Sequence, residues 1–200
     1  MDKKTKDSKI IVSIPRSGYN FIRYSVEFLT KKRTPGSKTR LITSGDSVFT
    51  HTHTPITPKG ISKMVLIIRD YKELQLRPNT ENDFTNNFTK FYYDLVDVFE
   101  KFNGEKILIR YEDLITDINE IKKIITFLDI PLIEDFEEFA KNEEKHRLKS
   151  LEISNINHSG GKDTKFYQSQ LNSTDEILKF EQGFKNYNPL LYEKYFKTYK

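Results

Sequence analysis

Residues that commonly bind anions follow the first apolar segment of the chain. Lys9–Ile14 is a mostly apolar run, and Pro15–Asn20 comes directly after it with Arg16, Ser17 and Gly18 inside. Backbone N–H groups at such a strand-to-helix turn can point at an oxyanion, and the positive end of the following helix adds to the attraction. Glycine lets the backbone approach closely, and a guanidinium can donate to two oxygens at once. This spacing therefore favours an anion-binding turn.

Two other interpretations fit the same turn. It could be an ordinary connection between a strand and a helix with an arginine on the surface. It could also belong to a kinase, but the nucleotide loop of that class has the pattern G-x-x-x-x-G-K-[ST]. The segment Pro15–Asn20 contains one glycine and no lysine. The kinase interpretation is therefore weaker, although it stays open.

Histidines are the candidate proton acceptors and metal ligands. His51 and His53 flank one residue in the alternating segment Ser47–Thr54, so a strand there would place both rings on one face. Such a pair could bind Zn²⁺, but the chain has no cysteine and no clear third ligand nearby, so we expect no metal. We expect His146 to be solvated, because Glu134–His146 is predicted to be an acidic helix.

The elements that would position these residues alternate along the chain. Apolar runs predict strands, and amphipathic or capped segments predict helices. Gly104 ends the long aromatic-rich helix, and Asn188-Pro189 breaks the last one. The predicted strands are Lys9–Ile14, Ser47–Thr54, Lys63–Arg69 and Lys106–Arg110. The predicted helices are one after Gly18, one over residues 84–102, one after a capping box at Asp117 and Glu120, one over Glu134–His146, and one after a second capping box at Ser173 and Glu176.

This alternation predicts an α/β fold with three layers. We expect a mainly parallel central sheet of about four to five strands flanked by helices. Ligands of such sheets bind at the carboxyl ends of the strands, so the turn at Pro15–Asn20 and the stretches after His53 and Arg69 should share one rim. We expect a charged tail at residues 1–8 and a single domain at 9–200.

Composition limits the classes of protein. The chain has 200 residues, no cysteine and a formal net charge of +4, with both signs interleaved. Disulfides and thiol nucleophiles are excluded, and the mild positive charge does not call for a nucleic-acid partner. We see no signal peptide and no window apolar enough to span a membrane, so we expect a soluble, cytoplasmic protein with no membrane partner.

The turn resembles the 5′-phosphosulfate loop of sulfotransferases that use 3′-phosphoadenylyl sulfate (PAPS). Many members have P-[KR]-S-G-x-T-x-L-R at this place. Asn20 stands where the family usually has threonine, and Phe21 where it often has tryptophan. The residues that match are Pro15, Arg16, Ser17, Gly18 and Arg23. The resemblance implies that the 5′ side of PAPS is held by Arg16, Ser17, Gly18, Tyr19, Asn20 and Phe21.

Two further segments resemble the family in the same order. Thr50–Pro55 is similar to the K-T-H-x-P stretch that supplies the general base, and His53 occupies the histidine position. Lys63–Glu73 resembles the strand and turn that bind the 3′-phosphate, with Arg69 at the phosphate-binding arginine. Arg77 stands where the family usually has a serine.

The resemblance extends toward the C-terminus. Ile107–Leu114 is similar to the family's Y-E-D-L segment, whose tyrosine lies near the adenine, and Tyr111 fills that position. The segment His158–Phe166 is similar to the glycine loop that closes over the 3′-phosphate, and it supplies Gly160, Gly161 and Lys162. Arg69, Arg77 and Lys162 would together hold that phosphate.

The resemblance implies the P-loop-like sulfotransferase fold and transfer of a sulfuryl group to a hydroxyl of a small molecule or glycan. His53 would accept the acceptor's proton, and Arg16 would stabilise the leaving oxygen, because a guanidinium stays protonated. Adenosine 3′,5′-bisphosphate would be the product, and no metal is implied. The alternatives are a nucleotide or small-molecule kinase and a non-catalytic, nucleotide-binding relic of the fold. The sequence does not indicate the oligomeric state.

Overall fold

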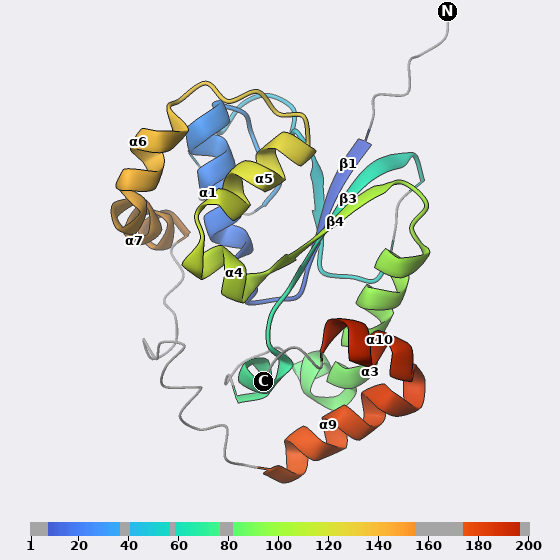
Figure 1. The fold of residues 1–200 in the computed structure, drawn as a ribbon. Coiled ribbons are helices and arrows are strands. Elements are labelled where there is room, and N and C mark those ends of the chain that lie inside the picture. The colour runs from blue at the N-terminus through green and yellow to red at the C-terminus, as the bar shows by residue number, and fades with distance from the viewer. Residues whose placement is uncertain (1–7, 37–40, 57–58, 77–81, 155–173, 197–200) are drawn as a thin grey trace, which may run out of the picture.

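A four-stranded, all-parallel sheet forms the centre of the protein in a computed structural model, which describes residues 8–36, 41–56, 59–76, 82–154 and 174–196. The strands lie in the order β2-β1-β3-β4 (Figure 1). Their bounds are β1 Ser8–Ser13, β2 Thr50–Thr52, β3 Ile61–Ile68 and β4 Glu105–Arg110.

Helices cover both faces of this sheet and make a three-layer α/β arrangement. Figure 1 shows α1, α4, α5, α6 and α7 on one side of the sheet and α3, α9 and α10 on the other. The bounds of the helices are α1 Tyr19–Thr30, α2 Tyr71–Leu76, α3 Asn82–Lys101, α4 Tyr111–Thr116, α5 Asn119–Phe127, α6 Phe136–Lys141, α7 Glu143–Ser154, α9 Thr174–Tyr187 and α10 Pro189–Tyr195.

Burial on both faces explains why the strands are apolar without interruption. Successive side chains of a strand point to opposite faces. Ile10 and Val12 of β1 accordingly pack into one cluster with α3, α9 and α10, whereas Ile11 packs into a second cluster with α1 and α5. Strand β3 divides in the same way, with Leu66 in the first cluster and Val65 in the second. The sequence pattern and the two apolar layers therefore agree.

The structure confirms the predicted strands and most helices, with differences at short elements. Strand β2 covers only Thr50–Thr52 of the predicted Ser47–Thr54. Two short helices, α2 and α4, were not predicted, and the predicted helix at Glu134–His146 is two helices, α6 and α7. The expected break at Asn188 is confirmed, because its side chain accepts hydrogen bonds from the backbone N–H groups that begin α10.

The expected capping box at Asp117 and Glu120 is wrong. Ile118 occupies the N-cap position of α5 and makes no side-chain cap. Asp117 Oδ1 accepts a hydrogen bond from the backbone N–H of Asn119 at 2.9 Å. This bond closes a short turn just before the helix. Glu120 faces Lys123 on the helix surface instead of reaching back. The second expected box begins at Ser173, which lies outside the described residues.

The expectation that His146 is solvated is also wrong. Its side chain lies under α1, with the residue 9% exposed, and Tyr24 Oη is 2.9 Å from His146 Nδ1. The ring stacks on Phe139 and also packs against Phe28. Burial lowers the pKa of His146. The charged neighbours in the sequence concealed this, because His146 occupies the inward-facing side of α7.

Candidate active site

The register of the sheet brings the predicted segments to one edge. Val12 of β1 is paired with Thr52 of β2, so Ser13 and His53 come next on adjacent strands. Ile68 of β3 is paired with Arg110 of β4, so the residues that follow, Arg69 and Tyr111, are also neighbours. The expectation that the turn and the stretches around His53 and Arg69 share a rim is therefore supported by the order and register of the strands.

The turn at Pro15–Asn20, which the sequence predicts to bind an anion, is a tight bend with two residues in the left-handed region. Arg16 has a φ of 68° and Gly18 a φ of 85°. Ser17 closes the bend, because its backbone N–H and its hydroxyl both donate to the carbonyl oxygen of Ile14, at 3.2 and 2.5 Å. Ser17 is 1% exposed. Its polar groups thus shape the turn, and an anion would meet the groups that follow it at the start of α1.

Residue 18 must be a glycine because its backbone lies close to the side chain of Tyr111. A Cβ on residue 18 would lie 3.0 Å from Tyr111 Cδ2 and 3.1 Å from Leu114 Cδ2. Residues with a side chain are strained at a φ of 85° in addition. The start of α1 is therefore packed directly on the first turn of α4, which brings the predicted 5′ loop and the predicted adenine tyrosine together.

Arg69 is a buried cation that ties these segments to each other. Its Nε and Nη2 donate to both carboxylate oxygens of Glu73, at 3.0 and 2.5 Å, and its Nη1 donates to the carbonyl oxygen of Arg16 at 2.5 Å. The guanidinium carbon lies 3.6 Å from the centre of the Tyr111 ring. Arg69 is 2% exposed. It is therefore a structural link between β3, the turn and α4, and its charge is balanced by Glu73.

His53 is held at the same edge by the backbone of β1. Its Nδ1 lies 2.7 Å from the carbonyl oxygen of Ser13 and 3.2 Å from Ser13 Oγ. A carbonyl oxygen only accepts hydrogen bonds, so this contact assigns the imidazole proton to Nδ1 in the neutral ring. The residue is exposed. The lone pair on Nε2 is then available to accept a proton.

His51 lies beside His53 and is half-buried under Tyr19. The rings of Tyr19 and His51 are stacked, with centroids 3.5 Å apart and planes 5° apart, and the Tyr19 hydroxyl donates to the carbonyl oxygen of Pro35. Burial, with smaller effects of His53 and Arg23, lowers the pKa of His51 to about 3. The side chain of Tyr19 therefore packs on the histidine segment.

The remaining predicted residues differ in where they lie. Asn20 is half-buried in the first turn of α1. The Phe21 side chain is buried in the cluster between the sheet and α1, so its backbone is the part nearest the turn. The predicted 3′-phosphate residues Arg77, Gly160, Gly161 and Lys162 lie outside the described residues.

Two carboxylates at the same edge were not singled out from the sequence. Asp70 follows β3, and its backbone N–H donates to Glu112 Oε1 at 2.9 Å. Burial raises the pKa of both carboxyls. Glu112 Oε2 is buried and has no hydrogen-bond partner among the described residues. Nothing in the local pattern Tyr111–Leu114 distinguishes this glutamate from an exposed one, because its burial depends on β3.

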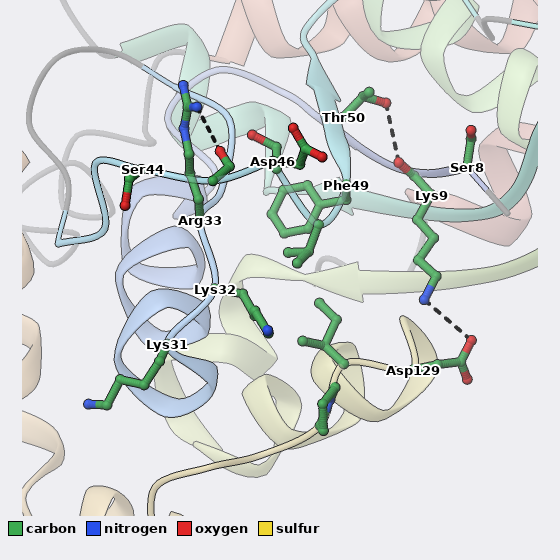
Figure 2. Close-up of a pocket in the computed structure, with 15 residues that line it drawn as sticks. Ser8, Lys9, Lys31, Lys32, Arg33, Ser44, Asp46, Phe49, Thr50 and Asp129 are labelled. Atoms are coloured by element: carbon green, nitrogen blue, oxygen red, sulfur yellow. Dashed lines mark hydrogen bonds and ion pairs between the residues drawn. The ribbon is translucent and has the colours of Figure 1, made fainter. Parts of the chain in front are cut away.

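A pocket of about 730 Å³ lies away from this edge, at the amino-terminal ends of β1 and β2. Figure 2 shows that its cationic side chains point in different directions: Lys9 is directed to Asp129, Arg33 and Lys31 extend away from Asp129, and Lys32 is directed into the pocket. Arg33 Nη1 donates to the carbonyl oxygen of Gly45 at 2.8 Å. The pocket therefore has no common point at which these cations would hold one anion.

The chain matches no protein-family model and no curated protein sequence. In residues that the structure describes, no three side chains of His, Cys, Asp or Glu are grouped so that they could hold a metal ion. Among the described helices, none combines the length and apolar character needed to cross a membrane.

Proposed function

We propose that this protein transfers a sulfuryl group from PAPS to an acceptor hydroxyl and has the P-loop-like sulfotransferase fold. The observation that carries the proposal is the contact between His53 Nδ1 and the Ser13 carbonyl oxygen, 2.7 Å, three residues before Arg16. It puts a candidate base with an available Nε2 beside a turn suited to an anion. The three-layer arrangement and the edge shared with Arg69 and Tyr111 support the same proposal.

The proposed reaction is an in-line transfer. The acceptor oxygen forms a bond to sulfur while the bond from sulfur to the 5′-phosphate oxygen breaks, and adenosine 3′,5′-bisphosphate leaves. His53 Nε2 takes the proton of the acceptor hydroxyl, a contribution of about 10²–10⁴-fold in comparable enzymes. Arg16 offsets the charge that develops on the leaving oxygen. The residues near the start of α1 add the positive end of the helix.

Arg69 has a defined part in this proposal. Its bonds to Glu73 and Arg16 keep the guanidinium fixed, and the Glu73 carboxylate balances its charge. It would hold the turn in shape and keep a guanidinium at a fixed position beside it. The 3′-phosphate would need further cations, for which Arg77 and Lys162 remain the predicted residues.

The first experiment is ligand binding measured by thermal denaturation. Adenosine 3′,5′-bisphosphate at 100 times its Kd should stabilise the protein by about 2.7 kcal/mol, and Mg-ATP should not. Stabilisation by Mg-ATP alone would instead favour the kinase. A close matched control is adenosine 5′-monophosphate, which lacks the 3′-phosphate and should give a smaller shift.

The second experiment is transfer from radiolabelled PAPS to a panel of sugars, phenols and glycans. A labelled product is expected with the wild type, and His53→Ala should lose turnover while it keeps bisphosphate binding. Equal loss of binding and turnover in His53→Ala would count against His53 as the base. Binding of the bisphosphate without transfer to any acceptor would favour the non-catalytic alternative.

A further inference from the structure

The hydroxyl of Ser13 lies between two imidazole rings. Ser13 Oγ is 2.8 Å from His51 Nε2 and 3.2 Å from His53 Nδ1, and Ser13 is 0% exposed. A serine hydroxyl has one proton, so it can donate to only one of these nitrogens. The direction of that proton and the tautomer of His53 are therefore coupled.

The other contacts of the two rings settle that direction. His53 Nδ1 faces the Ser13 carbonyl oxygen, which requires a proton on Nδ1, and this N–H also faces Ser13 Oγ. Ser13 Oγ then accepts on that side and donates to His51 Nε2. His51 can accept because burial keeps its ring neutral, with a pKa of about 3. In this arrangement each hydrogen-bonding group has a suitable partner: His53 Nδ1, the Ser13 carbonyl oxygen, Ser13 Oγ and His51 Nε2.

Ring packing holds His51 in the accepting position. Tyr19 is stacked on one side of His51, and the His53 ring meets it at an interplanar angle of 88° with centroids 4.5 Å apart. The hydrogen bond of Tyr19 Oη to the Pro35 carbonyl oxygen, 2.9 Å, fixes Tyr19 in turn. His51 therefore has little freedom to turn its Nε2 away from Ser13.

We infer that His51 is a positioning residue for His53: by accepting the Ser13 hydroxyl proton, it keeps the His53 proton on Nδ1 and the Nε2 lone pair free for the acceptor. This inference rests on the proposed function for its catalytic meaning, but the tautomer itself is a property of the protein without substrate. Without His51 Nε2, the Ser13 hydroxyl is free to turn to His53 Nδ1, where it competes with the Ser13 carbonyl oxygen. The opposite tautomer, whose Nε2 carries a proton and cannot act as a base, then gains population.

Long-range ¹H–¹⁵N NMR of the imidazole nitrogens, at a pH where the histidines are neutral, tests the inference on the intact chain. In the wild type, His53 should have a protonated Nδ1 and an unprotonated Nε2. His51→Phe keeps a ring for Tyr19 but removes the acceptor, and it should shift His53 toward a protonated Nε2. An unchanged His53 tautomer in a folded His51→Phe protein would overturn the inference.

The double variant provides the sharpest control. Ser13→Ala removes the competing hydroxyl but keeps the backbone carbonyl, so Ser13→Ala/His51→Phe should restore the proton to His53 Nδ1. A purely structural role of His51 predicts no such restoration. If His51→Phe does not fold, His51→Gln supplies an amide group in place of the ring, and its carbonyl oxygen should keep the wild-type tautomer. A protonated His53 Nε2 in that variant would contradict the inference.

Turnover separates this inference from the proposed function. His51→Phe should lower kcat about tenfold, a part of the roughly 10²–10⁴-fold that a positioned general base contributes, with KM for PAPS unchanged. The double variant should recover most of that loss. If the His53 tautomer changes as expected but neither the wild type nor any variant transfers the sulfuryl group from PAPS, the positioning role of His51 stands and the proposed sulfotransferase activity is refuted.

Discussion

Arg69 Nη1 donates to the carbonyl oxygen of Arg16 at 2.5 Å, so the cation that follows β3 holds the turn that follows β1. Arg16 itself has a φ of 68°, a backbone conformation that is unfavourable for residues other than glycine. The cost of that conformation is offset by this charge-assisted hydrogen bond from the buried Arg69. The shape of the turn is therefore maintained by a residue 53 positions away in the chain.

The buried pair of Arg69 and Glu73 should be essential for stability. Glu73→Gln leaves a buried guanidinium without its carboxylate, and removal of one partner from such a pair costs about 3–5 kcal/mol. Urea denaturation measures the change. The control is Glu152→Gln, because its pair with Lys149 is exposed at both side chains and should change stability by about 0.5 kcal/mol or less. Equal effects of the two variants would show that the Arg69 pair is not structural.

Gly18→Ala should destabilise more than the same change at another left-handed glycine. Gly60 has a φ of 81°, but a Cβ added there would have nothing within 4 Å, so Gly60→Ala should cost about 1 kcal/mol for the backbone alone. Gly18→Ala adds the contact with Tyr111 and should cost about 1 kcal/mol or more beyond that. Thermal or urea denaturation of the two variants gives the difference. A loss of stability in Gly60→Ala as large as or larger than in Gly18→Ala would mean that Tyr111 does not pack on the turn.

Substitutions of Arg16 should separate stability from activity. Arg16→Gly relieves the left-handed conformation and should be more stable than Arg16→Ala by about 1 kcal/mol. Both variants lack the guanidinium, so both should lose PAPS-dependent transfer to a similar degree. Transfer that follows stability, with Arg16→Gly close to wild type, would argue against an electrostatic role of Arg16.

Stability should fall on acidification because of His146. Burial lowers its pKa in the folded state, so the unfolded chain takes up the proton first as the pH falls. Above about pH 6.5, the ordinary pKa of histidine, His146 is neutral in both states and the free energy of unfolding is not reduced by it. Below that pH, the free energy of unfolding decreases because of His146 by at most about 1.4 kcal/mol per pH unit. Urea denaturation between pH 8 and pH 5 measures it. His146→Gln should show a shallower decrease, and an identical slope would exclude His146 as a cause.

Regular elements, and the edge of the sheet at which the candidate site lies, could be predicted because the strands depend on local patterns. Lys9–Ile14 and Lys63–Arg69 are apolar runs long enough for buried strands, and parallel strands place their carboxyl ends at one edge. That is why the sequence alone predicts His53 near the turn. The P-loop-like fold and the role of His53 remain predictions.

Side-chain partners could not be predicted in the same way, because they join residues far apart in the chain. Ser17 was expected to face a ligand, and its hydroxyl instead closes the turn. His146 was expected in water, and Tyr24 and Phe139 cover it. In both cases the residue type allowed either environment, and the packing of another segment selected one.

The pattern of apolar residues and turn formers in the chain was sufficient to indicate the strands and the bend after β1, since each depends on neighbours within a few positions. The expectation of a histidine near the bend needed, in addition, the parallel pairing of those strands. The Ser13 link between His51 and His53, the Arg69 contact to Arg16 and the approach of Gly18 to Tyr111 arose only when β1, β2, β3 and β4 took their register. Hydrogen bonds and ring contacts act over a few ångströms, so they are set by which strands lie side by side.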